Sequence, residues 1–166
     1  MLSTPLRQIT GLEIWRYVTG VFLTIGNESD FRYFLPRILE ISTSDRGAAV
    51  NPEIVIGKLG RAGWKQWPAH EQEVLQIYLD ALFEMALSLD LDDAAEGYGI
   101  ISCEAEAVMC GAAIAGVSLD RWLARLQMPD AAPVLKHLRS SFPRKPTGFW
   151  EDAPDGHAQV CRLLDQ

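Results

Sequence analysis

Residues 69–90 have the sequence AHEQEVLQIYLDALFEMALSLD, which is the clearest helical pattern in the chain. Apolar side chains recur in it at steps of three and four residues, the spacing that places them on one face of an α-helix. This apolar stripe consists of Leu75, Tyr78, Leu82, Met85 and Leu89, widened by Leu79, Phe83 and Ala86. The opposite strip is polar and consists of Glu73, Gln76, Asp80 and Glu84. The segment therefore predicts a long amphipathic helix with an acidic outer side.

Acidic residues continue beyond this helix. We expect them in a turn region, where they are Asp90, Asp92, Asp93 and Glu96. The C-terminal end of a helix disfavours anions, so such a cluster lowers stability unless a cation lies nearby. Residues 51–100 carry nine acidic and three basic side chains, so most of the net charge of −7 comes from this third of the chain.

Helices are also predicted on the N-terminal side of this segment. Residues 11–26 have only a narrow polar strip, which predicts a central helix covered by its neighbours. Asp30 is a candidate cap for a short helix over residues 31–42, with Pro36 in its first turns or at a kink. Asn51, followed by Pro52 and an acid, predicts a helix that runs to about Arg61.

The C-terminal half predicts further helices. Residues 97–116 are rich in small side chains, which is typical of a helix packed closely against others, and Ser118 or Asp120 begins the next one. Two more helices are expected over residues 130–142 and after Asp155. No alternating strand pattern occurs. We therefore expect one all-α domain, residues 1–166, with seven or eight helices packed as a HEAT-like α-α array or as an irregular helical bundle.

Composition narrows the classes of partner and compartment. Fifteen Lys and Arg oppose 22 Asp and Glu, the wrong sign for a protein that grips nucleic acid directly. The start of the chain, MLSTPLRQIT, lacks the pattern of a secretory signal, and no stretch reaches the roughly 18 apolar residues of a membrane span. Three cysteines without CxxC spacing favour neither a disulfide framework nor a zinc site. We expect a cytoplasmic protein that is not associated with a membrane.

Candidate catalytic groups are few. Cys103, Cys110 or Cys161 is formally available to pair with His137 or His157, but no flanking motif points a thiol at a cleft, so buried structural thiols are favoured. The acids Glu104 and Glu106 are two residues apart and should point to different sides of a helix. No metal-ligand spacing appears. The sequence therefore predicts neither an enzyme nor a cofactor.

Trp64 and Trp67 lie close together in WKQWP, just before the long helix. Exposed aromatic side chains of this kind anchor many protein interfaces. Capping of the hydrophobic core is the favoured alternative, because large aromatics bury well in the links between helices.

Three segments resemble a family of uncharacterised bacterial helical proteins. They are DFRYFLPRILEIS (residues 30–42), NPEIVIGKLGRAGWKQWP (51–68) and EQEVLQIYLDALF (71–83), and the family segments have the forms DFRxFLPRILEL and KLxxAxWxxWP. The resemblance covers about residues 25–90. It implies a helical fold and a bacterial origin, and it implies no activity.

The sequence favours a protein-binding module, most concretely a bacterial immunity protein that neutralises a cognate toxin by occluding it with an acidic surface. The partner would be basic, and its contact residues would be Glu73, Asp80, Glu84, Asp90, Asp92, Asp93, Glu96, Trp64 and Trp67. One alternative is a small helical enzyme or ligand-binding domain with a cleft between helices, using Glu104, His137 or a cysteine. Another is a scaffold subunit that self-associates through its aromatic segments. The sequence leaves open whether the chain is a monomer or a homodimer.

Overall fold

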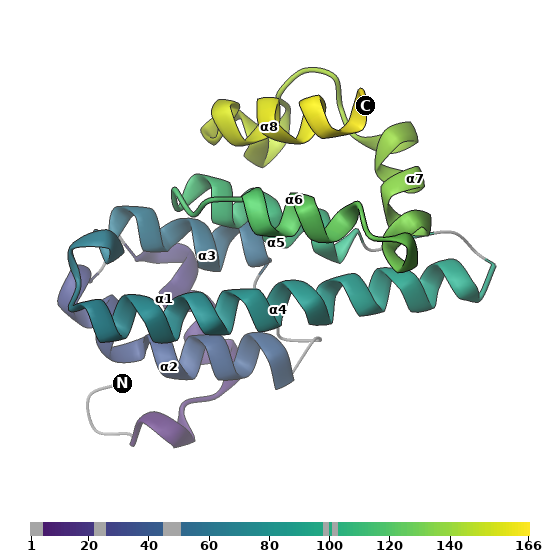
Figure 1. Cartoon of the computed structure of the whole chain (residues 1–166). Helices are drawn as coiled ribbons and strands as arrows, with labels where there is room; N and C mark the ends of the chain where they lie inside the picture. The colour runs from purple at the N-terminus through teal and green to yellow at the C-terminus, as the bar shows by residue number, and fades with distance from the viewer. Residues whose placement is uncertain (1–4, 22–25, 45–50, 98–99, 101–102) are drawn as a thin grey trace.

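The computed structural model describes residues 5–21, 26–44, 51–97, 100 and 103–166. Over these residues the chain is all-α, with eight α-helices and no strand (Figure 1). The helices are α1 Gly11–Gly20, α2 Glu28–Ser44, α3 Pro52–Arg61, α4 Ala69–Ala95, α5 Glu104–Ile114, α6 Asp120–Leu126, α7 Ala132–Ser141 and α8 Pro154–Leu164. Four short 3-10 helices join them, η1 Leu6–Gln8, η2 Trp64–Gln66, η3 Pro129–Ala131 and η4 Gly148–Asp152. The predicted fold class and number of helices are confirmed.

The helices form an irregular bundle. Figure 1 shows α7 running across the direction of α4, α6 and α8, so consecutive helices do not stack as a regular array of pairs. Among the described residues, none of the helices is both long and apolar enough to cross a bilayer.

Helix α4 is the longest element, with 27 residues, which at about 1.5 Å per residue makes it about 40 Å long. It crosses the molecule between α2 and α6 (Figure 1). On the α2 side, the Tyr78 hydroxyl donates to the Leu39 carbonyl at 3.1 Å. On the α6 side, the rings of Phe83 and Trp122 stack with centroids 4.8 Å apart. Helix α4 is thus covered by α2 along one side and by α6 along another, and the surface of α4 that lies between these two sides faces outward.

Helices α3 and α5 pack closely against each other. A Cβ atom at Gly111 of α5 would lie 2.7 Å from the Pro52 carbonyl oxygen, which is too close for any side chain. The absence of a side chain at this position is what lets the two backbones meet. Small residues along α5 were expected to serve this purpose.

Two predicted helix starts differ in detail. Helix α2 begins after Asn27, whose side chain accepts from the Asp30 backbone N–H at 3.1 Å, while the Asp30 carboxylate accepts from the Asn27 N–H at 3.0 Å. Asn27 is therefore the cap, and the prediction that Asp30 caps the helix was wrong by three residues. Helix α3 begins and ends where predicted, although the Asn51 side chain makes no capping hydrogen bond.

The prediction for residues 11–26 was also partly wrong. Helix α1 ends at Gly20, Val21 is extended, and residues 22–25 lie outside the described part of the chain. Leu12 is 62% exposed and Trp15 is exposed as well, so α1 lies at the periphery of the core.

Candidate functional site

Asp90 was expected on an acidic surface, but only 1% of it is exposed. Its carboxylate accepts hydrogen bonds from the backbone N–H groups of Glu104 and Ala105, each at 2.9 Å, at the start of α5. Burial raises the pKa of this carboxyl group, although the two hydrogen bonds oppose the increase. Asp90 therefore holds α4 against the positive end of α5 and has no surface for a partner.

Asp80 and Glu84 connect α4 to α6. Asp80 is half-buried, forms an ion pair with Arg121 at 2.7 Å and accepts from the Trp122 indole N–H at 2.9 Å. Glu84 is exposed and forms an ion pair with Arg125 at 3.2 Å. These basic partners reduce the negative potential along this edge of α4.

Trp64 and Trp67 are both buried. The Trp64 indole N–H donates to the Ala115 carbonyl at 2.9 Å, and that of Trp67 donates to the Ala62 carbonyl at 3.0 Å. The two rings cap the core at the turn before α4. Because both side chains are buried, they offer little area for an interface. They cap the hydrophobic core, which was the favoured alternative for these residues.

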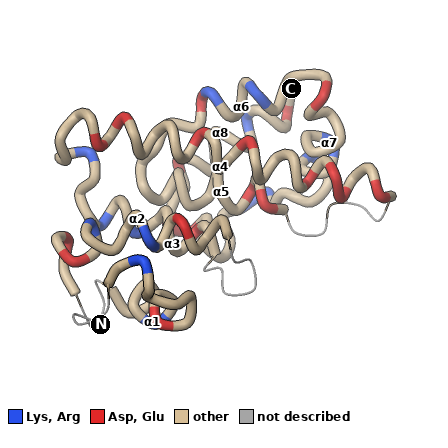
Figure 2. The backbone as a smooth tube through the Cα atoms, turned by 90° about the horizontal axis from the view of Figure 1, so that it is seen from below, with Lys and Arg blue, Asp and Glu red and all other residues tan. Residues whose placement is uncertain are grey.

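The remaining predicted contact residues stay near the surface. Glu73, Asp92 and Glu96 are exposed, and none of the three forms an ion pair with another described residue. Asp93 is half-buried. Figure 2 shows acidic positions along the whole molecule, including the C-terminal end of α4. The negative charge is therefore not concentrated in one surface patch.

An exposed apolar stripe on α4 was missed by the sequence analysis. Val74 is 66% exposed and Ile77 is 63% exposed, and Ala81 and Met85 continue the same line at steps of four residues. We call these four residues the outer stripe. Met85 had been assigned to the buried face. The signal was present in the sequence, because Val74 and Ile77 are large apolar residues that lie beside the predicted acidic strip.

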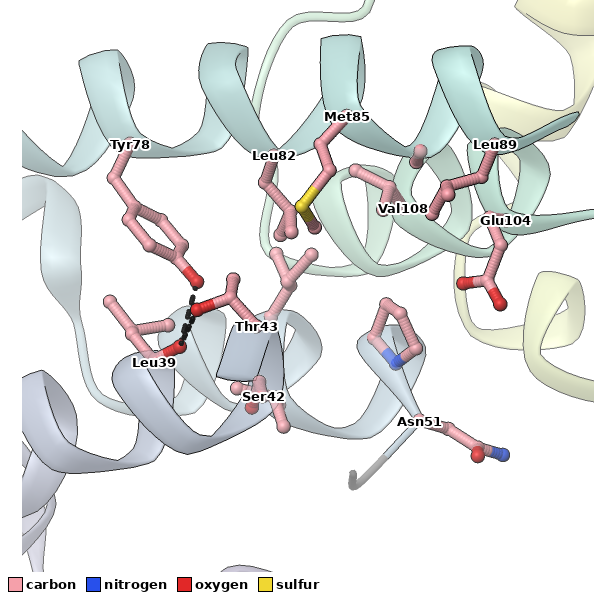
Figure 3. Close-up of a pocket in the computed structure, with 14 residues that line it drawn as sticks. Leu39, Ser42, Thr43, Asn51, Tyr78, Leu82, Met85, Leu89, Glu104 and Val108 are labelled. Carbon is pink, nitrogen blue, oxygen red and sulfur yellow. Dashed lines mark hydrogen bonds between the residues drawn. The ribbon is translucent and has the colours of Figure 1, made fainter. Parts of the chain in front are cut away.

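A pocket of about 200 Å³ opens beside Met85, between α4 and helices α2, α3 and α5 (Figure 3). Leu82, Leu89 and Val108 form apolar walls. The polar groups at its edges are those of Ser42, Thr43, Asn51, Tyr78 and Glu104. The Tyr78 hydroxyl is already bonded to the Leu39 carbonyl, and burial raises the pKa of Tyr78 to about 12.

Two thiol–imidazole contacts bear on the alternative enzyme hypothesis. Cys161 Sγ lies 3.8 Å from the His157 Nδ1, and Cys103 makes the shorter contact, with His137. The Cys103 Sγ lies 3.3 Å from the His137 Nε2, and Cys103 has a left-handed backbone with φ of 50°. Burial and the acids around it, Glu106 first among them, raise the pKa of the thiol. The first two backbone N–H groups of α5, which could stabilise a developing oxyanion, donate to Asp90 instead. This geometry favours a protonated structural thiol over a nucleophile.

Glu104 and Glu106 point to different sides of α5, as predicted, because each lines a different cavity. Glu106 faces a cavity of about 440 Å³ beside Glu53 and residues 141–150, and it accepts from the Trp150 indole N–H at 3.1 Å. Burial raises the pKa of both Glu53 and Glu106. Neither carboxylate forms an ion pair with a described Lys or Arg. No metal-binding group of three or more His, Cys, Asp and Glu occurs within the described ranges.

Comparisons of the chain with protein-family models, with curated proteins and with solved structures give no match.

Proposed function

We propose that this chain is a protein-binding module that occludes a basic protein partner, in its most concrete form an immunity protein that neutralises a toxin. The observation that supports this function best is the outward face of α4. There the exposed apolar side chains of Val74 and Ile77 lie beside the exposed carboxylates of Glu73 and Glu84. An apolar centre with a charged edge is the usual composition of a protein interface.

The charge of the whole chain supports a basic partner. A net charge of −7 attracts cationic proteins from a distance and accelerates their encounter at low salt. The carboxylates that carry this role are those the structure leaves accessible, Glu73, Asp92 and Glu96, with Glu84 shared with Arg125. Asp90, Trp64 and Trp67 are assigned structural roles instead.

The proposal includes no catalytic role. The Cys103 thiol has a raised pKa, and the neighbouring helix N-terminus is occupied by Asp90. A binding module needs only a surface of fixed shape, which a packed helical bundle provides.

Affinity capture with the tagged chain tests the proposal. We expect one basic protein to be retained at low salt and released as the salt concentration rises, because exposed charges are screened. The double variant Glu73→Lys with Asp92→Lys should reduce recovery by about tenfold or more. Glu151→Lys with Asp155→Lys is the matched control, since it changes the net charge by the same amount and both residues are exposed acids on η4 and α8, away from α4.

The immunity role needs a second readout. The captured protein should arrest growth when it is expressed alone, and co-expression of this chain should restore growth. A harmless partner would exclude the immunity role. Recovery that is unchanged in the Glu73 and Asp92 variant would exclude the acidic face of α4 as the binding surface.

A further inference from the structure

We propose that the outer stripe of α4 docks a basic amphipathic helix of the partner, and that one Lys or Arg side chain of this helix enters the pocket beside Met85. This inference rests on the proposed function, because it names the form in which the basic partner is recognised. It adds the secondary structure of the bound segment and the chemistry of its anchoring residue.

The spacing of the outer stripe matches a helical ligand. Val74, Ile77, Ala81 and Met85 follow one another at steps of three and four residues, the repeat that two packed helices share. Val74 and Ile77 are about two-thirds exposed, so most of their apolar surface is left uncovered by the described part of the chain. Ala81 lies in the middle of the stripe, where its small side chain allows another helix to approach closely.

Charges around the stripe select a basic ligand. Glu73 and Glu84 lie along its α6 side, and Asp92 and Glu96 follow at the C-terminal end of α4. A helix with Lys or Arg at its edges would meet opposite charge at Glu73, Asp92 and Glu96, whereas Glu84 is already shared with Arg125. A second copy of this chain would bring the same carboxylates together and would add its own charge of −7, so charge complementarity favours a different, basic protein.

The pocket beside Met85 fits the end of a long basic side chain. Its volume of about 200 Å³ lies below the roughly 300–1,000 Å³ of small-molecule sites and suits one side chain. Leu82, Leu89 and Val108 line it for an aliphatic stem (Figure 3). Glu104 and Asn51 supply acceptors at its edge, which suits Lys and Arg because these side chains have donors and no acceptor.

Binding of a synthetic peptide tests this inference. The probe is a fluorescently labelled helical peptide with Leu on one face and Lys on both edges, titrated with the full chain and followed by anisotropy. Two control peptides carry the same residues in a scrambled order, or Glu in place of every Lys. We expect the amphipathic Lys peptide to bind at least about tenfold more tightly than either control.

Matched variants locate the binding. Ile77→Ser should weaken binding of the Lys peptide by about tenfold, whereas Leu12→Ser should leave it unchanged. Ile77 and Leu12 are 63% and 62% exposed, so the two changes remove similar apolar surface from different faces. Glu104→Gln should weaken binding by about three- to tenfold. Equal helical circular dichroism of all variants would show that each one is folded.

Several results would overturn the docking proposal. They are equal binding of the scrambled or Glu peptide, equal effects of Ile77→Ser and Leu12→Ser, no effect of Glu104→Gln, and a dimeric chain that Ile77→Ser converts to a monomer. The last result would make a second copy the occupant. If the peptide fails to bind while cellular capture still depends on Glu73 and Asp92, only the docking proposal fails. If peptide binding depends on Ile77 while no basic partner is captured, only the proposed function fails.

Discussion

Asp90 is the residue whose role changes most between the sequence and the structure. It accepts hydrogen bonds from two backbone N–H groups at the start of α5, and Asp90→Ala would remove both of them, one of which is fully buried. We expect the free energy of unfolding to fall by about 1–3 kcal/mol in urea denaturation. Asp92→Ala is the control, because Asp92 is exposed on the same helix and should change stability by less than about 0.5 kcal/mol. Equal effects of the two changes would show that Asp90 does not cap α5.

Two tyrosines, Tyr17 buried and Tyr78 half-buried, differ in their hydrogen bonding. Among the described residues the buried Tyr17 hydroxyl has no hydrogen-bond partner, whereas the Tyr78 hydroxyl donates to the Leu39 carbonyl at 3.1 Å. Burial raises the pKa of each to about 12. Tyr17→Phe should therefore increase the free energy of unfolding by about 1 kcal/mol, and Tyr78→Phe should decrease it by about the same amount. Thermal unfolding of the two variants checks the opposite signs, and a loss of stability in Tyr17→Phe would contradict the unpaired hydroxyl.

At the level of elements, the contact between α3 and α5 depends on Gly111. A Cβ atom there would collide with the Pro52 carbonyl oxygen and with backbone and Cβ atoms of α3, which cannot move aside without separating the helices. Gly111→Ala should lower the free energy of unfolding by about 1–3 kcal/mol, even though Ala favours a helix more than Gly does. The control is Gly57→Ala, whose Cβ would have its three nearest contacts with side-chain atoms of Ile114 and none of them with backbone. Its measured change in urea unfolding should stay within about 1 kcal/mol.

The sequence predicted elements well where local signals define them. Helix α3 begins at Pro52 and ends at Arg61 as expected, because a proline at the first position and a glycine just beyond the end are local features. Helix α4 instead continues to Ala95, although its acids predicted a turn from Asp90. Half-buried Leu91 packs against the core and Asp90 is satisfied by α5, and neither contact is visible in a local pattern.

The candidate site was predicted less completely than the fold. The exposure of Glu73 follows from helical spacing alone, whereas Asp92 and Glu96 were expected in a turn and are exposed at the C-terminal end of α4 instead. Trp64 is buried where its indole N–H bonds to the carbonyl of Ala115. Ala115 lies 51 residues away in the chain, so the local sequence does not indicate this contact. The pocket beside Met85 combines residues from four helices, so no single segment of sequence indicates it.

At the scale of the whole molecule, charge and burial together give a pH dependence of stability. Burial raises the pKa of Glu53, Asp90 and Glu106 in the folded state, with His137 and His157 partly opposing the increase at Glu106. At these three groups the folded chain therefore binds more protons than the unfolded chain at pH values above about 4, the range in which free carboxyl groups ionise. Their contribution to stability is greatest at low pH and is lost as the pH rises through the raised folded-state pKa values.

We therefore expect these three groups to increase the free energy of unfolding as the pH is lowered from neutral toward the ordinary pKa of a free carboxyl group, about 4. Paired acids act in the opposite direction, because Arg32 lowers the pKa of Glu71, and that contribution is lost only in more acidic solution. Urea unfolding at a series of pH values measures the slope. The double variant Glu53→Gln with Glu106→Gln should flatten it, whereas Glu151→Gln should retain the wild-type slope because Glu151 is exposed. An unchanged slope in the double variant would show that these two carboxyl groups are not the ones that couple folding to pH.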